Sequence, residues 1–221
     1  MDKPRVWITG TGVATSLGFD FATFSRNLLE GRSAVQVVVD QNPNGEFRSP
    51  GCLLPVISVP KGWTEEAFRR LPRVQQAALW CCSEALANSG WSEAAENVRI
   101  GLVLGVGAEW LHHWEMNTTS GGDNLYTAGE QQSLLSLTQE RLGLQGPATT
   151  IAAACASGNY SLNLARSWIQ QGIVDVCIAG GVEIVTPVCR ANFHNLRALS
   201  RRIDDVSQAS RPFDRGRDGF V

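Results

Sequence analysis

The sequence predicts an α/β protein, and three observations lead to that class. Short apolar segments rich in β-branched residues alternate with longer segments whose apolar residues recur at helical spacing. Near the end of the chain, a strand pattern, a helix pattern and a second strand pattern follow one another within roughly 30 residues, the length of a βαβ unit. With 43% hydrophobic and 18% charged residues, the 221-residue chain has the composition of a globular protein with a sizeable core.

The N-terminal quarter starts with one strand and one helix. Val6–Thr9 is a short β-branched and aromatic segment, and we expect a buried first strand there. Asp20 is expected to cap a helix that Gly31 ends. Residues 40–62 are rich in proline and glycine, so they are interpreted as an irregular excursion.

The middle of the chain contains the clearest helix. After Pro72, apolar and small residues between Val74 and Ser89 recur at i, i+3, i+4 and i+7, and Gly90 stops the pattern. Arg99–Leu104 then predicts a strand, and a helix is expected over about Glu130–Leu142.

The last third predicts the βαβ unit itself. Thr149–Ala154 is small and β-prone, Asn159–Gln171 carries apolar residues at helical spacing, and Val174–Ala179 is an apolar run. A helical crossover of this length connects parallel strands, so the two strands are expected to be parallel.

Composition argues against several classes of function. The formal net charge of −2 gives no electrostatic reason to expect binding to nucleic acid or to an anionic membrane. The N-terminus shows no signal-peptide pattern, and no apolar stretch is long enough to span a bilayer. The six cysteines form no CxxC pair and no metal-ligand pattern, so we expect a reduced, cytoplasmic protein without a bound metal.

Cys155 is the strongest candidate for chemistry. It lies among small residues in Ala152–Gly158, between the strand and the helix of the βαβ unit. A strand end places it at the carboxyl edge of the sheet, where α/β proteins build their sites, and the start of the next helix favours a thiolate. The alternative is a buried structural cysteine, which is the commoner fate of this residue.

The other cysteines are expected to have lesser roles. Cys81 and Cys82 lie in a helix and Cys177 lies in an apolar strand, so all three are interpreted as packing residues. Cys52 and Cys189 have no activating neighbours in the sequence.

Histidines and a glycine motif support no further site. His112 and His113 stand in a polar loop without nearby carboxylate or cysteine partners, and His194 is alone, so solvated histidines are the expected interpretation. Thr9–Thr15 is similar to a dinucleotide fingerprint, but the third glycine and the following acidic residue are absent.

Arginines cluster in two places, each with acidic residues nearby. The clusters are Arg69, Arg70 and Arg73, and Arg197, Arg201 and Arg202. A solvated, salt-bridged surface is the ordinary interpretation of such a cluster. A docking patch for an acidic partner is the alternative.

Three segments together resemble the β-ketoacyl-[acyl-carrier-protein] synthases. Ala152–Gly158 looks like the active-site cysteine motif of that family, and Ser210–Val221 resembles the segment that carries its Arg-Pro-Phe-Asp motif. Val6–Val13 is similar to the family's first strand. The resemblance covers the whole chain in order, and it is closest to the elongating synthases of type II fatty acid synthesis.

The resemblance implies a fold and an assembly. The expected fold is thiolase-like, a layered α/β structure with a mixed sheet, of which residues 1–221 would be the N-terminal half. The family is usually homodimeric. The C-terminal half, which supplies two histidines and a lysine for decarboxylation, is expected to be absent from this sequence or present as a separate chain.

The resemblance also implies the chemistry. Cys155 would accept an acyl group from an acyl-carrier protein, and malonyl-carrier protein would then lose CO₂ and attack the Cys155 thioester, in fatty acid or polyketide synthesis. No cofactor is expected beyond the phosphopantetheine that delivers the acyl groups. The alternative is a non-catalytic partner subunit of a condensing-enzyme complex.

Five further residues receive roles from the resemblance alone. Ala108 falls where relatives place an acyl-pocket residue, and Phe193 falls near the pocket mouth. Arg69, Arg70 and Arg197 align with positions that contact the acidic carrier protein.

Overall fold

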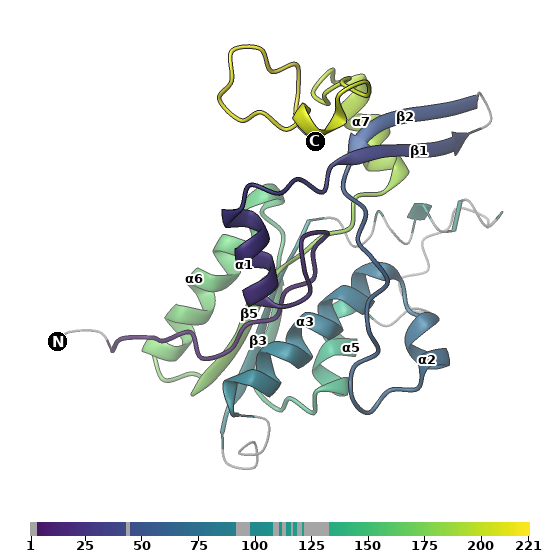
Figure 1. Ribbon diagram of the computed structural model, residues 1–221. Coiled ribbons are helices and arrows are strands. Elements are labelled where there is room, and N and C mark those ends of the chain that lie inside the picture. Colours follow the sequence, from purple (N-terminus) through teal and green to yellow (C-terminus); the bar gives the residue numbers. More distant parts are fainter. Residues whose placement is uncertain are drawn as a thin grey trace. The chain divides into compact units, whose positions relative to one another are not determined.

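The computed structural model describes residues 4–42, 45–91, 98–107, 111, 114–115, 117–118, 121 and 133–221 (Figure 1). The chain forms two compact units. The first, here called the sheet unit, comprises Met1–Gly12 and Ile57–Ile184. The second, the hairpin unit, comprises Val13–Val56 and Val185–Val221.

A three-stranded parallel sheet organises the sheet unit. Its strand order is β4 (Ala148–Ile151), β3 (Ile100–Val106) and β5 (Val176–Val182), and β3 pairs in parallel with both neighbours. The predicted βαβ unit is confirmed, because helix α6 (Ser157–Gln170) connects β4 to the parallel strand β5. The connection passes over β3, so β4 and β5 are not neighbours.

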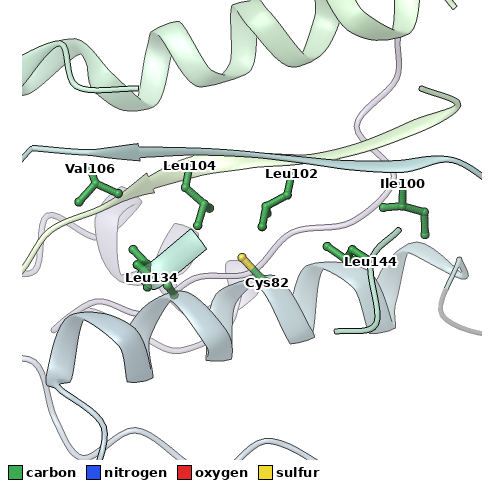
Figure 2. Close-up of a cluster of buried hydrophobic side chains, with 8 residues drawn as sticks. Cys82, Ile100, Leu102, Leu104, Val106, Leu134 and Leu144 are labelled. Atoms are coloured by element: carbon green, nitrogen blue, oxygen red, sulfur yellow. The ribbon is translucent and has the colours of Figure 1, made fainter. Parts of the chain in front are cut away.

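The main hydrophobic core lies between one face of this sheet and two helices, α3 (Arg73–Ser89) and α5 (Leu134–Arg141). Figure 2 shows alternate side chains of β3 directed towards α3, where Cys82, Leu134 and Leu144 meet them. The members on β3 are Ile100, Leu102, Leu104 and Val106. Both helices were predicted, and Gly90 ends α3 with the left-handed φ of +78° that a glycine C-cap supplies.

The N-terminal segment corrects one prediction. Val6–Thr9 is not a strand, and Trp7 and Ile8 are 75% and 82% exposed. The segment pairs with none of the three strands of this sheet. The chain instead runs against α3, where the Asn88 side chain donates to the Thr11 carbonyl (2.8 Å) and accepts from the Thr11 N–H (2.9 Å).

The hairpin unit corrects a second prediction. Residues 40–62 were expected to be irregular, but strand β1 (Gln36–Asn42) and strand β2 (Gly45–Gly51) form an antiparallel pair. Proline did not prevent pairing because Pro50 lies near the end of β2, and strand ends tolerate a missing N–H donor. Parallel and antiparallel pairing therefore both occur, in separate sheets.

Polar side chains fix two helices of the hairpin unit. Helix α1 (Phe21–Leu29) follows Asp20, whose carboxylate caps it by accepting the Thr23 N–H at 2.7 Å. Hydrogen bonds from the backbone and the side chain of Thr23 hold the Asp20 pKa below its usual value. Helix α7 (Pro187–Asn195) is joined to β1 by an ion pair between Arg190 and Asp40, with an Nε–Oδ2 distance of 2.8 Å.

The remaining elements are short. They are helix α2 (Glu65–Arg69) and two 3₁₀ turns, η2 (Ala154–Ala156) and η3 (Val206–Gln208). Among the described residues, no helix has both the length and the apolar character needed to cross a membrane.

Candidate active site around Cys155

Cys155 lies at the carboxyl edge of the parallel sheet. It is the middle residue of η2, which follows β4 and leads directly into α6, and it is exposed. This is the position that the sequence predicted, and the alternative of a buried structural cysteine is wrong.

The turn that carries Cys155 holds a strained backbone. Ala154 has a φ of +49°, a left-handed conformation that costs a residue with a Cβ atom roughly 1–2 kcal/mol. Ser157 fixes the turn from inside, since its buried hydroxyl donates to the Ala154 carbonyl (2.7 Å) and accepts from the Ala153 N–H (2.9 Å). Strain of this kind is characteristic of functional turns.

Glycines bring the start of α6 into backbone contact with the sheet. A Cβ atom on Gly105 of β3 would lie 2.5 Å from the Ser157 carbonyl carbon, and one on Gly181 of β5 would lie 3.0 Å from the Gly158 Cα. The fully buried Ser161 hydroxyl adds a polar link, at 3.0 Å from the Gly180 carbonyl oxygen. This close contact holds the helix start, and Cys155 just before it, at the sheet edge.

The start of α6 offers electrostatic stabilisation. The helix has 14 residues and no side-chain cap, so its first N–H groups are not occupied by a capping side chain. The partial positive charge of a helix N-terminus stabilises a negative charge nearby. When the Cys155 sulfur attacks the carbonyl carbon of a thioester, the oxyanion on the carbonyl oxygen would therefore develop next to these groups.

Four of the other five cysteines, Cys81, Cys82, Cys177 and Cys189, are less accessible than Cys155. Burial raises the pKa of Cys81 to about 11 and those of Cys82 and Cys177 to about 12. A thiol with so high a pKa is almost entirely protonated near neutral pH and reacts slowly. Cys52 is the other exposed cysteine, so it is the natural comparison for Cys155.

A carboxylate at the same sheet edge was not predicted as a site residue. Glu183 directly follows β5. Its Oε2 atom lies only 2.4 Å from the position that a Cβ atom on Gly107 would take. Gly107 directly follows β3, so the ends of adjacent strands bring these two residues together. The glycine-rich sequence around them gave a signal for close backbone approach, but not for the carboxylate. Ala108, the predicted acyl-pocket residue, lies outside the described residues.

Arg69 and Arg70, predicted as docking residues, lie together on α2 but in different surroundings. The Arg69 guanidinium donates to the Ile57 carbonyl (2.7 Å) and pairs with Glu65 (3.3 Å), and its side chain is 32% exposed. Arg70 pairs with Glu66 and is 77% exposed. Arg70 is thus the more accessible of the two.

Phe193 and Arg197 belong to the hairpin unit. Phe193 lies on α7, with its ring in an edge-to-face contact with Phe220 at 5.1 Å, and Arg197 is exposed beyond the end of that helix. His194 makes a similar edge contact with Phe47 at 4.7 Å, rather than standing free in solvent. His112 and His113 lie outside the described residues. Among the residues that are described, no group of three or more His, Cys, Asp or Glu is placed to hold a metal ion.

Comparisons with known proteins agree on one family. The protein-family model named beta-ketoacyl synthase, N-terminal domain, matches residues 3–221 of this chain. The chain is 32% identical to a putative polyketide β-ketoacyl synthase 1 from Streptomyces cyaneus, covering 98% of this chain and 55% of that protein. It is 30% identical to a 3-oxoacyl-[acyl-carrier-protein] synthase 2 from Coxiella burnetii, covering all of this chain and 56% of that protein.

A solved structure agrees in fold. It is a type II polyketide ketosynthase bound to a hexaketide in complex with its acyl-carrier protein; the chain matches it with a TM-score of 0.77 and 22% identity, over all of this chain and 56% of that one. The chain thus spans about half the length of the curated relatives it matches. Their shared architecture is the thiolase-like α/β fold that the sequence predicted. The family model and the relatives together show that the chain belongs to the β-ketoacyl synthases, in the part that forms their N-terminal domain.

Proposed function

We propose that this chain carries the nucleophile of a β-ketoacyl synthase and that Cys155 is the residue that accepts the acyl group. One observation carries the proposal: an exposed thiol stands in a strained turn at the carboxyl edge of a parallel sheet, directly before a helix N-terminus. Family membership supplies the class of reaction, an acyl transfer between thioesters.

The first half-reaction uses Cys155, which lies in this part of the enzyme, as its nucleophile. The Cys155 sulfur attacks the carbonyl carbon of an acyl thioester, and the bond from that carbon to the carrier's sulfur breaks. The proton of the Cys155 thiol passes to the departing carrier thiol, so charge and atoms balance. The Cys155 N–H and the start of α6 stabilise the oxyanion of the tetrahedral intermediate.

The second half-reaction is proposed for the enzyme as a whole, because its relatives are nearly twice as long as this chain. Malonyl-carrier protein loses CO₂, and the carbanion that remains attacks the acyl-Cys155 carbonyl. The carbon–sulfur bond to Cys155 breaks, which releases the β-ketoacyl-carrier protein and leaves a Cys155 thiolate that takes up a proton from solvent. The product belongs to fatty acid or polyketide synthesis, the two classes that appear among the relatives' names.

The proposed partner is an acyl-carrier protein, which a structural relative binds. Arg70 and Arg197 are proposed to contact its acidic surface, with Arg69 serving mainly to hold α2 through its bond to Ile57. Ala108 and Phe193 remain the proposed acyl-pocket residues. We also propose a homodimer in the cytoplasm that uses no cofactor besides the carrier's phosphopantetheine, with residues 1–221 as the N-terminal half.

Intact-mass spectrometry after incubation with an acylated carrier protein tests the proposal. The wild-type chain is expected to gain one acyl group, Cys155→Ala none, and Cys52→Ala one, because Cys52 matches Cys155 in exposure but not in position. Acylation that persists in Cys155→Ala would contradict the assignment. Absence of acylation in a chain that circular dichroism shows to be folded would favour the alternative, a non-catalytic partner subunit.

A further inference from the structure

One buried side chain holds the turn that presents Cys155. The Ser157 hydroxyl donates to the Ala154 carbonyl at 2.7 Å and accepts from the Ala153 N–H at 2.9 Å. Ser157 is the first residue of α6, and it is only 4% exposed. The hydroxyl therefore bonds, as donor and as acceptor, to the backbone just before Cys155, and its burial keeps it from contact with a substrate on a carrier protein.

The backbone completes this network without using the Cys155 N–H. The Ala156 N–H donates to the Ala153 carbonyl at 3.0 Å, and the Ser157 N–H donates to the Ala154 carbonyl. Ala153 is thus bonded through both of its backbone polar groups, and the Ala154 carbonyl accepts twice. None of these hydrogen bonds uses the N–H of Cys155, so they fix the turn without competing for a donor that the oxyanion needs.

The bond from Ala153 to the hydroxyl depends on the strained conformation of the turn. In a regular helix the N–H groups point towards the N-terminus, so a side chain four residues later cannot accept from them. Here Ser157 does accept from an N–H four residues earlier, because the chain changes direction at Ala154, whose φ is +49°. The left-handed residue is thus held by a hydrogen bond that a relaxed turn would lose.

The helix start that carries Ser157 is itself fixed to the sheet. A Cβ atom on Gly105 would lie 2.5 Å from the Ser157 carbonyl carbon, so the backbone of Ser157 lies directly on β3. Through Ser157, the sheet fixes the turn, and the turn fixes Cys155. This link limits how far the Cys155 sulfur can move relative to the start of α6.

We propose that Ser157 is a positioning residue for acyl transfer. Its hydroxyl holds Ala153 and Ala154 in the turn that keeps the Cys155 sulfur and the Cys155 N–H at the start of α6. The inference rests on the proposed function, in which the sulfur attacks a thioester carbonyl while the N–H stabilises the oxyanion. Without the hydroxyl the turn relaxes, and the sulfur and the N–H no longer meet the same carbonyl group. A misplacement of about 1 Å can lower a reaction rate by roughly 100-fold.

Rapid-quench acylation of the full-length chain, followed by intact-mass spectrometry, measures a rate and an amplitude separately. The rate reports the positioning of Cys155 in folded chains, and the amplitude reports the fraction of chains that react. Ser157→Ala is expected to lower the rate at saturating acyl-carrier protein by at least about tenfold. The carrier concentration that gives half of this rate should stay within about twofold, because the buried Ser157 does not contact the carrier. A lower amplitude with an unchanged rate would make Ser157 merely structural and would overturn the proposal.

Two further variants separate positioning from the loss of any buried hydroxyl. The fully buried Thr138 hydroxyl in α5 donates to the Leu134 carbonyl at 2.7 Å, the same distance as in the bond from Ser157 to Ala154. Thr138→Val is expected to lower the melting temperature but to keep the acylation rate within about twofold of the wild-type rate. Ser157→Thr keeps the hydroxyl and is expected to recover most of the rate. An equal loss of rate in Thr138→Val and Ser157→Ala would overturn the proposal.

A melting-temperature cycle tests the link to the strained residue without any acyl transfer. Ala154→Gly relieves the left-handed strain, so it is expected to raise the melting temperature of the wild-type chain by roughly 1–4 °C. In the Ser157→Ala chain the turn is already free to relax, so the same substitution should give a smaller rise. An equal rise in both backgrounds would overturn the proposal.

The two measurements separate this proposal from the proposed function. A wild-type chain that is folded but takes up no acyl group would count against the proposed function, and the melting-temperature cycle would then decide whether Ser157 holds the turn. A wild-type chain that is acylated, with an unchanged rate in Ser157→Ala, would leave the proposed function in place and overturn the role of Ser157.

Discussion

Replacing Gly105 by alanine tests whether close backbone packing positions the catalytic turn. A Cβ atom at this position would lie 2.5 Å from the Ser157 carbonyl carbon, 2.6 Å from its oxygen and 2.7 Å from the Gly158 nitrogen. All three are backbone atoms at the start of α6, so no side chain can turn aside. The helix start has to move away from β3.

The expected cost of Gly105→Ala is about 2–3 kcal/mol, the upper part of the range for overpacking a close-packed interior. For a chain of this length that corresponds to a fall in melting temperature of roughly 4–12 °C. Gly180 provides a matched control on the neighbouring strand β5, because a Cβ atom there meets nothing within 4 Å. Differential scanning calorimetry of both variants checks the argument. Equal melting temperatures for Gly105→Ala and Gly180→Ala would refute it.

Three further substitutions probe the strained turn and two ion pairs. Ala154→Gly should stabilise the chain by about 0.5–1 kcal/mol in urea unfolding, since glycine accepts the φ of +49°; destabilisation would contradict the strain. Hydrogen bonds from the Arg99 side chain lower the pKa of Asp175. Its contribution to the free energy of unfolding is therefore fully present above the unfolded pKa of about 3.9, and it is lost as the pH falls through the lowered pKa of the folded state. Asp175→Asn should therefore lower the melting temperature at pH 6 but much less at pH 3, and an equal deficit at both would contradict this. Asp40→Ala leaves the largely buried charge of Arg190, 13% exposed, without its partner and should cost about 3 kcal/mol in urea unfolding. A cost of less than about 1 kcal/mol, typical of a surface pair, would contradict this.

Local patterns predicted the elements whose causes are local. The apolar spacing after Pro72 and the glycine at position 90 predicted α3 correctly, and the carboxylate of Asp20 predicted the start of α1. The order of strand, small-residue turn and helix placed Cys155 at the sheet edge. Each of these depends on residues within a few positions of one another.

The errors concern partners that are distant in the sequence. Val6–Thr9 has strand-forming residues, but whether it pairs depends on whether the folded chain brings it beside another strand, and among the described residues it runs against α3 instead. The hairpin of β1 and β2 was missed because Gly45, Pro50 and Gly51 fall at or near the ends of β2, where pairing tolerates them. The approach of Glu183 to Gly107 arises from the ends of two strands that no local pattern brings together.

Competitive alkylation of the folded chain tests the central claim, that Cys155 is the reactive nucleophile. Limiting iodoacetamide at pH 7.5, followed by peptide mapping, compares all six cysteines in one experiment. Cys155 is expected to be labelled at least about tenfold faster than Cys52, because Cys155 adjoins the start of a helix and Cys52 does not. Labelling of Cys155 and Cys52 at the same rate, in a chain that retains its native circular dichroism spectrum, would contradict the claim.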